Sequence, residues 1–124
     1  MVRLLTFGAL AAWLAASAAQ AADAVSIGRA VFASQCSICH SNARNGPVIQ
    51  GPPLYGVIGR RAGSVGGFAY SPAMKAAGFV WTADRLRAYL PGPRDYIPGV
   101  RMSYAGLKNS AQLEALITYL DSLK

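Results

Sequence analysis

The feature that most restricts the fold of this chain is a long stretch of turn-forming residues near its middle. Eleven of the 29 residues in 44–72 are glycine or proline, among them Gly51-Pro52-Pro53 and Gly66-Gly67. Proline interrupts the hydrogen bonding of helices and sheets and glycine weakens both, so long regular elements are excluded from this stretch. A loop of this length inside a compact domain is normally functional or wrapped around something.

Helical patterns lie on both sides of this stretch. The apolar positions in 25–33 predict a short helix that contains Gly28. An internal glycine lowers helix propensity by roughly 1 kcal/mol, so we interpret Gly28 as a point of close approach by another element. Three more helices are predicted: 72–75 with Ser71 as cap, 82–90 with Thr82 as cap and Pro91 and Pro93 as stops, and 110–123. No long alternation of apolar and polar residues predicts a sheet, so the chain is expected to be all-α.

The first 21 residues have a composition of their own. Sixteen of them are apolar, Arg3 is the one charged residue, and Ala19-Gln20-Ala21 closes the segment. This is the pattern of a cleavable secretory signal peptide. The apolar run of thirteen residues is shorter than the roughly 20 that a membrane-spanning helix needs. We therefore predict a signal peptide over 1–21, one domain over 22–124, and a soluble periplasmic product without stable membrane insertion.

One motif carries chemistry: Cys36-Ser37-Ile38-Cys39-His40, or C-x-x-C-H, the attachment signature of c-type haem. Two thiols at this spacing can form thioethers to the two vinyl groups while the adjacent imidazole meets the iron. A thioredoxin-like disulfide would need a βαβ context that the sequence lacks. A zinc site would need four ligands, whereas these three are contiguous. We predict one covalent haem c on Cys36 and Cys39, with His40 as the proximal iron ligand.

The sixth ligand of the iron is not a second histidine of this chain, because His40 is the only one. A methionine, a weaker ligand such as lysine or tyrosine, water, or an open position remain. Met74 lies in a predicted helix, whereas Met102 follows the irregular loop 97–101, which can close over the opposite face of the haem. We favour Met102, since a thioether opposite histidine is a known electron-transfer ligation.

With these residues the chain resembles the class I c-type cytochromes, the family of mitochondrial-like and bacterial soluble cytochromes c. The resemblance covers 22–124 and implies an all-α fold of helices and long loops wrapped around one covalent haem. It also implies an electron carrier and not an enzyme. Besides the haem motif it rests on an ordered series: Gly28, Phe32, Gly51-Pro52, Gly59-Arg60, Trp81, Tyr89-Leu90, Tyr96-Ile97-Pro98-Gly99, Met102, Leu116 and Tyr119.

The resemblance also implies roles for single residues. The Pro52 carbonyl would accept a hydrogen bond from His40 and fix its orientation. Tyr89 would place its hydroxyl near the Met102 sulfur. The first and last helices would cross at Gly28. Four groups would hold the haem propionates: Arg60, Tyr70, Ser71 and Trp81.

The chain is basic, with formal charge +7 from 12 Lys and Arg against 5 Asp and Glu, or +6 without Arg3. A nucleic-acid site would need a dense basic stripe, whereas these cations are scattered. Docking to acidic-faced redox proteins, such as an oxidase, reductase or dehydrogenase, is the better interpretation. The resemblance places Arg94, Arg101 and Lys108 around the exposed haem edge for this purpose.

The leading hypothesis is a monomeric mono-haem electron carrier that cycles between Fe(II) and Fe(III) with His40 and Met102 as ligands. One alternative is a dedicated cytochrome subunit or acceptor of a single periplasmic dehydrogenase. Another is a ligand-binding or peroxidase-like haem protein, in which Met102 does not ligate. Binding of carbon monoxide to the ferrous protein at neutral pH would favour that last hypothesis.

Overall fold

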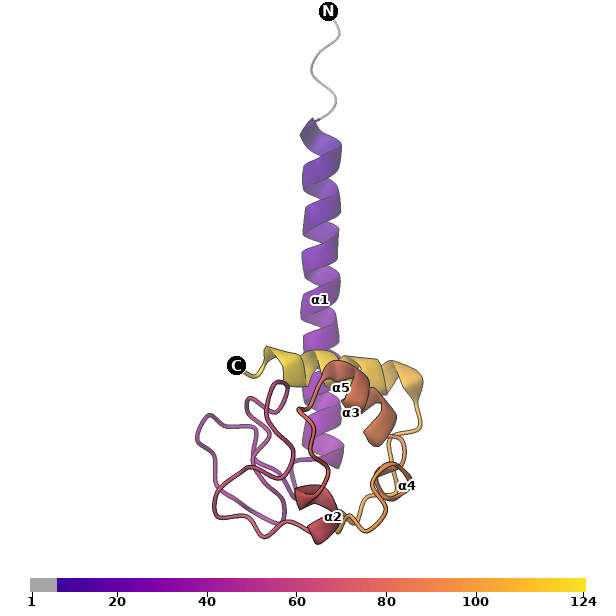
Figure 1. Cartoon of the computed structure of the whole chain (residues 1–124). Coiled ribbons are helices and arrows are strands. Elements are labelled where there is room, and N and C mark those ends of the chain that lie inside the picture. Colours follow the sequence, from indigo (N-terminus) through magenta and orange to yellow (C-terminus); the bar gives the residue numbers. More distant parts are fainter. Residues whose placement is uncertain (1–6) are drawn as a thin grey trace, which may run out of the picture.

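The computed structural model describes the backbone of residues 7–124 and the side chains of 11–124, so Arg3 of the predicted signal peptide lies outside the described residues. Five helices follow one another: α1 (Phe7–Gln35), α2 (Pro72–Lys75), α3 (Ala83–Tyr89), α4 (Pro93–Tyr96) and α5 (Ser110–Ser122) (Figure 1). Over 7–124 the only β-type pairings are two isolated bridges, His40 with Val48 and Arg61 with Val80. The all-α prediction is confirmed.

The first and last helices cross, with α5 lying over the C-terminal half of α1 (Figure 1). Gly28 lies at the crossing, where an added Cβ would be 2.0 Å from the Ala115 carbonyl oxygen. One turn further along α1, Phe32 packs edge-on against Tyr119, with 5.7 Å between the ring centroids. The predicted close approach at Gly28 is confirmed, because any larger side chain would push the two helices apart.

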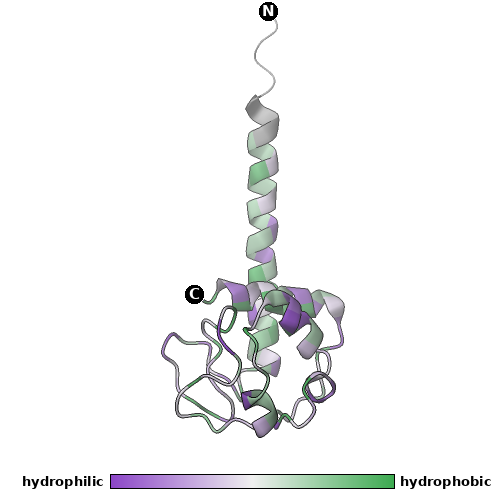
Figure 2. Ribbon diagram, viewed as in Figure 1, coloured by the Kyte–Doolittle hydropathy of each residue, from purple (hydrophilic) through white to green (hydrophobic). Residues whose placement is uncertain are grey.

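The helix α1 is longer than the predicted 25–33, because it begins at Phe7 and ends at Gln35. Alanine is abundant before residue 25 and has the highest helix propensity of all residues, so the helix continues through this segment. The N-terminal half of α1 projects from the rest of the molecule (Figure 1), and its part from residue 11 onward is largely apolar in Figure 2, with Trp13 77% exposed. Across the described residues, no helix has the length and apolar character needed to cross a membrane.

The helices α2 and α3 begin where the sequence predicts. The Ser71 hydroxyl accepts a hydrogen bond from the Met74 amide at 3.1 Å, and the Thr82 hydroxyl accepts one from the Arg85 amide at 3.2 Å. Each bond satisfies one of the amides that a helix leaves unpaired at its start.

The helices α4 and α5 differ in how well the sequence predicts them. The predicted stop before Pro91 and Pro93 is confirmed, because α3 ends at Tyr89. The short helix α4, which begins at Pro93, is not predicted by the sequence. Proline fits the first position of a helix, where its missing amide hydrogen is not needed. The predicted helix 110–123 is present as α5, which begins after Asn109, whose side chain accepts from the Gln112 amide at 2.9 Å.

The long loop is fixed to the segment before α3 by backbone hydrogen bonds. The Gly59 amide donates to the Trp81 carbonyl at 2.8 Å, and the Trp81 amide donates to the Arg60 carbonyl at 2.9 Å. The Ala62 amide donates to the Phe79 carbonyl at 2.8 Å. These bonds hold the loop around one side of the molecule and place the Trp81 ring in the core, where it is 7% exposed.

Candidate functional site

The two cysteines and the histidine lie on one tight turn at the end of α1. The Cys36 amide donates to the Phe32 carbonyl at 2.8 Å, which continues the helical pattern by one residue. The Cys39 and His40 amides then both donate to the Cys36 carbonyl, at 3.1 and 2.9 Å. Both cysteines are free thiols. The turn therefore presents two reactive sulfurs and one imidazole within five residues, which is the arrangement that haem attachment needs.

The imidazole of His40 is held in one orientation. Its Nδ1 lies 2.7 Å from the Pro52 carbonyl oxygen, and an added Cβ on Gly51 would be 2.3 Å from its Cε1. A carbonyl only accepts, so Nδ1 carries the proton and the lone pair of Nε2 is available to a metal. Burial lowers the pKa of His40, the bond to Pro52 opposes this, and the charge of Arg60 lowers the pKa further. The ring is therefore neutral near pH 7, as an iron ligand must be.

The thiols are not arranged as a reactive redox pair. Burial raises the pKa of Cys36 to about 11, and the neighbouring Cys39 adds to this. The Cys39 thiol donates to the Gln50 side-chain oxygen at 3.4 Å. Catalytic C-x-x-C pairs instead lower the pKa of one cysteine to make a thiolate. The chemistry of the donor set therefore fits thioether attachment of haem better than thiol–disulfide exchange.

Met102 lies in the loop between α4 and α5, where its side chain is half-buried. The Tyr89 hydroxyl, from α3, donates to the Met102 sulfur at 3.3 Å. Burial raises the pKa of Tyr89 to about 12, so its hydroxyl keeps its proton at physiological pH. Tyr89 therefore directs a lasting hydrogen bond at the Met102 thioether.

The four predicted propionate residues lie in the long loop and just after it. Arg60 and Trp81 are joined by the backbone bond described above. Burial lowers the pKa of Arg60, and the charge of Tyr70 opposes this by raising it. The Trp81 ring packs against Tyr89, with 4.9 Å between centroids. Ser71 is buried and its hydroxyl oxygen already caps α2. The structure thus connects Arg60 to Trp81, which packs against Tyr89, and it gives Ser71 a structural role as the cap of α2.

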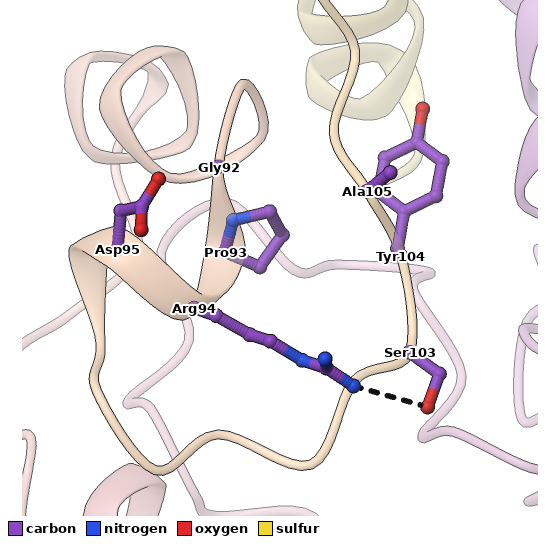
Figure 3. Close-up of a pocket in the computed structure, with 7 residues that line it drawn as sticks. All are labelled: Gly92, Pro93, Arg94, Asp95, Ser103, Tyr104 and Ala105. Atoms are coloured by element: carbon purple, nitrogen blue, oxygen red, sulfur yellow. Dashed lines mark hydrogen bonds between the residues drawn. The ribbon is translucent and has the colours of Figure 1, made fainter.

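The three predicted docking cations are exposed, and each donates to an oxygen of its own chain. Figure 3 shows Arg94 reaching toward Ser103, with 3.5 Å between Nη2 and Oγ, across an open depression of about 470 Å³. Asp95 lines the same depression, so a carboxylate lies beside Arg94, one of the three cations. The other two contacts run from Arg101 Nη2 to the Tyr70 carbonyl at 2.9 Å and from Lys108 Nζ to the Pro91 carbonyl.

One contact near the site, between Tyr104 and Gln35, is not predicted by the sequence. The Tyr104 hydroxyl donates to the Gln35 side-chain oxygen, although 69 positions separate the two residues. Burial raises the pKa of Tyr104, and the nearby Cys36 adds to the effect, which places the ring beside the attachment turn. No local pattern of residues predicts a contact across so many positions.

Comparison with known proteins identifies the family. The family model described as cytochrome c matches residues 25–124. The chain belongs to the cytochrome c family. It is 45% identical over 93 residues to a cytochrome c of Theileria parva, covering 75% of this chain and 80% of that protein. It is 43% identical over 121 residues to the cytochrome c2 of Blastochloris viridis, covering 96% of this chain and 92% of that protein.

Membership of this family confirms the expected fold, cofactor and broad activity. Cytochromes c carry electrons and are not enzymes, they bind haem c covalently, and their partners are redox proteins. Cys36 and Cys39 are the cysteines of the attachment motif in this chain.

Proposed function

We propose that the chain is an exported mono-haem electron carrier in which His40 and Met102 bind the iron from opposite faces. The observation that carries this proposal is the hydrogen bond from the Tyr89 hydroxyl to the Met102 sulfur, 3.3 Å long. A buried donor is directed at the Met102 thioether, whereas Met74 belongs to α2 and is packed in the core. Haem supplies one-electron Fe(II)/Fe(III) chemistry when bound.

The residues around the site keep the ligands from moving when the charge of the iron changes. Pro52 and Gly51 fix the His40 ring on one side, and Tyr89 contributes to the placement of the Met102 sulfur on the other. Two thioethers from Cys36 and Cys39 would anchor the macrocycle itself. A rigid set of this kind needs little rearrangement when an electron arrives or leaves, because binding groups are already in place.

The proposed partners are acidic-faced redox proteins that meet the chain at Arg94, Arg101 and Lys108. All three side chains are exposed. Their donors contact the Ser103 hydroxyl and the carbonyls of Tyr70 and Pro91, respectively. Cationic groups beside the redox centre attract an acidic surface and speed encounter. Asp95 lines the same depression as Arg94 and reduces the positive charge there.

The proposed location is the periplasm, after removal of residues 1–21. The alignment with the bacterial cytochrome c2 covers 96% of this chain, so it includes most of this N-terminal segment, whereas the alignment with the Theileria parva protein covers 75%. Cleavage after Ala21 leaves Gly28 and the crossing with α5 intact, because both lie in the C-terminal part of α1. The mass of the exported holoprotein tests this: it should correspond to a chain that begins at Ala22.

The experiment that tests the proposed function is a redox titration followed by exposure of the ferrous holoprotein to carbon monoxide at neutral pH. We expect one reversible one-electron step and no binding of carbon monoxide, because Met102 fills the sixth position. The Met102→Ala variant should bind it. Carbon monoxide binding to the unaltered holoprotein would contradict the proposal and favour an open-site haem protein.

A further inference from the structure

The loop that carries Met102, residues 101–106, makes no backbone–backbone hydrogen bond within the described chain. The nearest such bonds are at its two ends, from the Val100 amide to Ile97 at 3.0 Å and from the Leu107 amide to Leu90 at 2.9 Å. The loop ends at Gly106, whose φ of 117° lies in the left-handed region that favours glycine. Side chains must therefore fix the position of Met102.

Four side-chain hydrogen bonds anchor this loop. Three of them connect it to residues 70–94, and they are Arg101 to the Tyr70 carbonyl at 2.9 Å, Tyr89 to the Met102 sulfur at 3.3 Å, and Arg94 to Ser103 at 3.5 Å. The last two are weak, one because sulfur is a poor acceptor and the other because of its length. The fourth is the bond from Tyr104 to Gln35.

Among the described residues, the Tyr104–Gln35 bond is the one hydrogen bond between the Met102 loop and α1. Gln35 is the last residue of α1 and directly precedes Cys36. Figure 3 shows the Tyr104 hydroxyl directed away from Ser103 and Arg94, so the two contacts hold the loop from different sides. The bond therefore connects the Met102 loop to the end of α1, directly before the turn that carries Cys36, Cys39 and His40.

We propose that Tyr104 and Gln35 form a latch that keeps the Met102 loop closed, so that Tyr104 is a positioning residue for Met102. This inference rests on the proposed function, because it takes Met102 as the sixth ligand. When the latch opens, the loop keeps its fixed ends at Val100 and Leu107 but loses its connection to α1. Met102 then leaves its position more often, without unfolding of the domain.

Imidazole binding to the ferric holoprotein at neutral pH measures this opening, since imidazole binds only when Met102 has left. A neutral hydrogen bond shifts such an equilibrium by about threefold to tenfold. Tyr104→Phe should therefore tighten imidazole binding by about this factor. Gln35→Leu should do the same, and the double variant should match either single one. Gln35→Glu keeps an acceptor oxygen and should stay close to the unaltered protein.

Tyr55→Phe is the matched control, because it also removes a tyrosine hydroxyl, but one that donates to the Lys124 carbonyl at the C-terminus. It should leave imidazole affinity unchanged. The latch is refuted if Tyr104→Phe has no effect, if the two single effects simply add, or if Tyr55→Phe has the same effect. Met102→Ala separates this result from the proposed function, because an unchanged imidazole affinity in that variant would show that Met102 is not the ligand.

Discussion

At Gly28 the absence of a side chain determines how closely α1 and α5 approach. We predict that Gly28→Ala destabilises the holoprotein by about 2 kcal/mol, since a clash with backbone puts the overpacking cost at the upper end of about 1–3 kcal/mol and the gain in helix propensity returns roughly 1 kcal/mol. The physical cause is the backbone oxygen of Ala115, only 2.0 Å from the added Cβ. Guanidinium unfolding measures the change.

Gly66→Ala is the control for this substitution. A Cβ at Gly66 meets no atom within 4 Å, and its φ is not in the left-handed region. The free energy of unfolding of the Gly66→Ala variant should differ from that of the unaltered holoprotein by less than about 0.5 kcal/mol. Equal losses in the two variants would show that close packing at Gly28 is not the cause.

The Tyr89 hydroxyl acts on the redox centre through the Met102 sulfur. A donor at the sulfur withdraws electron density from it, which disfavours the ferric iron relative to the ferrous iron. We predict that Tyr89→Phe lowers the reduction potential by about 20–65 mV, on the scale of one hydrogen bond in a one-electron couple. Electrochemistry of the two holoproteins measures the shift, and a raised potential would contradict this account.

This contribution of Tyr89 should not depend on pH in the neutral range. Burial raises the pKa of Tyr89 to about 12, so the hydroxyl stays protonated and continues to donate well above pH 9. The difference in potential between the unaltered protein and Tyr89→Phe should therefore stay constant from pH 6 to pH 9. A difference that disappears within this range would mean that Tyr89 ionises earlier than its burial implies.

Among the elements, α5 depends on the residue that precedes it as well as on its apolar face. The Asn109 side chain caps α5 by accepting from the Gln112 amide. We predict that Asn109→Ala costs about 1 kcal/mol of stability, whereas Asn109→Ser costs little because serine caps equally well. Thermal unfolding of the two variants tests the cap, and equal losses would contradict it.

The elements that the sequence predicts are those with a local signal. Ser71 and Thr82 predict the starts of α2 and α3, and the apolar stripe predicts α5. Capping and amphipathic periodicity act within a few residues and are therefore visible in the sequence. Pro91 and Pro93 correctly mark the end of α3, but α4 is not predicted, since proline both ends and begins helices and only the surrounding fold decides between the two. The start of α1 lies earlier than the predicted residue 25, because alanine favours a helix in a signal peptide and in a domain alike.

In the candidate site, too, only the features with a local signal are predicted from the sequence. The C-x-x-C-H motif is contiguous, so the attachment turn is visible in the sequence alone. The approach of Gly51 to His40, the Gln50 acceptor for Cys39 and the Tyr104–Gln35 bond join residues that the chain brings together only on folding. Such contacts leave no periodic or local pattern in the sequence.

At the scale of the whole molecule, the positive charge should govern the rate of electron transfer. We predict that oxidation of the ferrous holoprotein by ferricyanide slows as ionic strength rises, because salt screens exposed charges beyond about 8 Å at 0.15 M. Each of Arg94→Gln, Arg101→Gln and Lys108→Gln should reduce the low-salt rate by roughly twofold. Stopped-flow measurement gives the rates.

Arg44→Gln is the matched control, because it removes one exposed arginine from the long loop. It should reduce the low-salt rate less than the three docking substitutions. If all four substitutions have the same effect, net charge alone governs the reaction and no docking patch exists on this face.

The most direct test of ligation by His40 and Met102 is the visible spectrum of the ferric holoprotein and of two methionine variants. Met74→Leu is a volume-conserving change at a core residue that is 8% exposed, so the fold should persist. We predict that the weak red-end band of a methionine-ligated ferric haem is present in the unaltered protein and in Met74→Leu, and absent in Met102→Ala. A band that survives in Met102→Ala, or that is lost in Met74→Leu, would contradict the account.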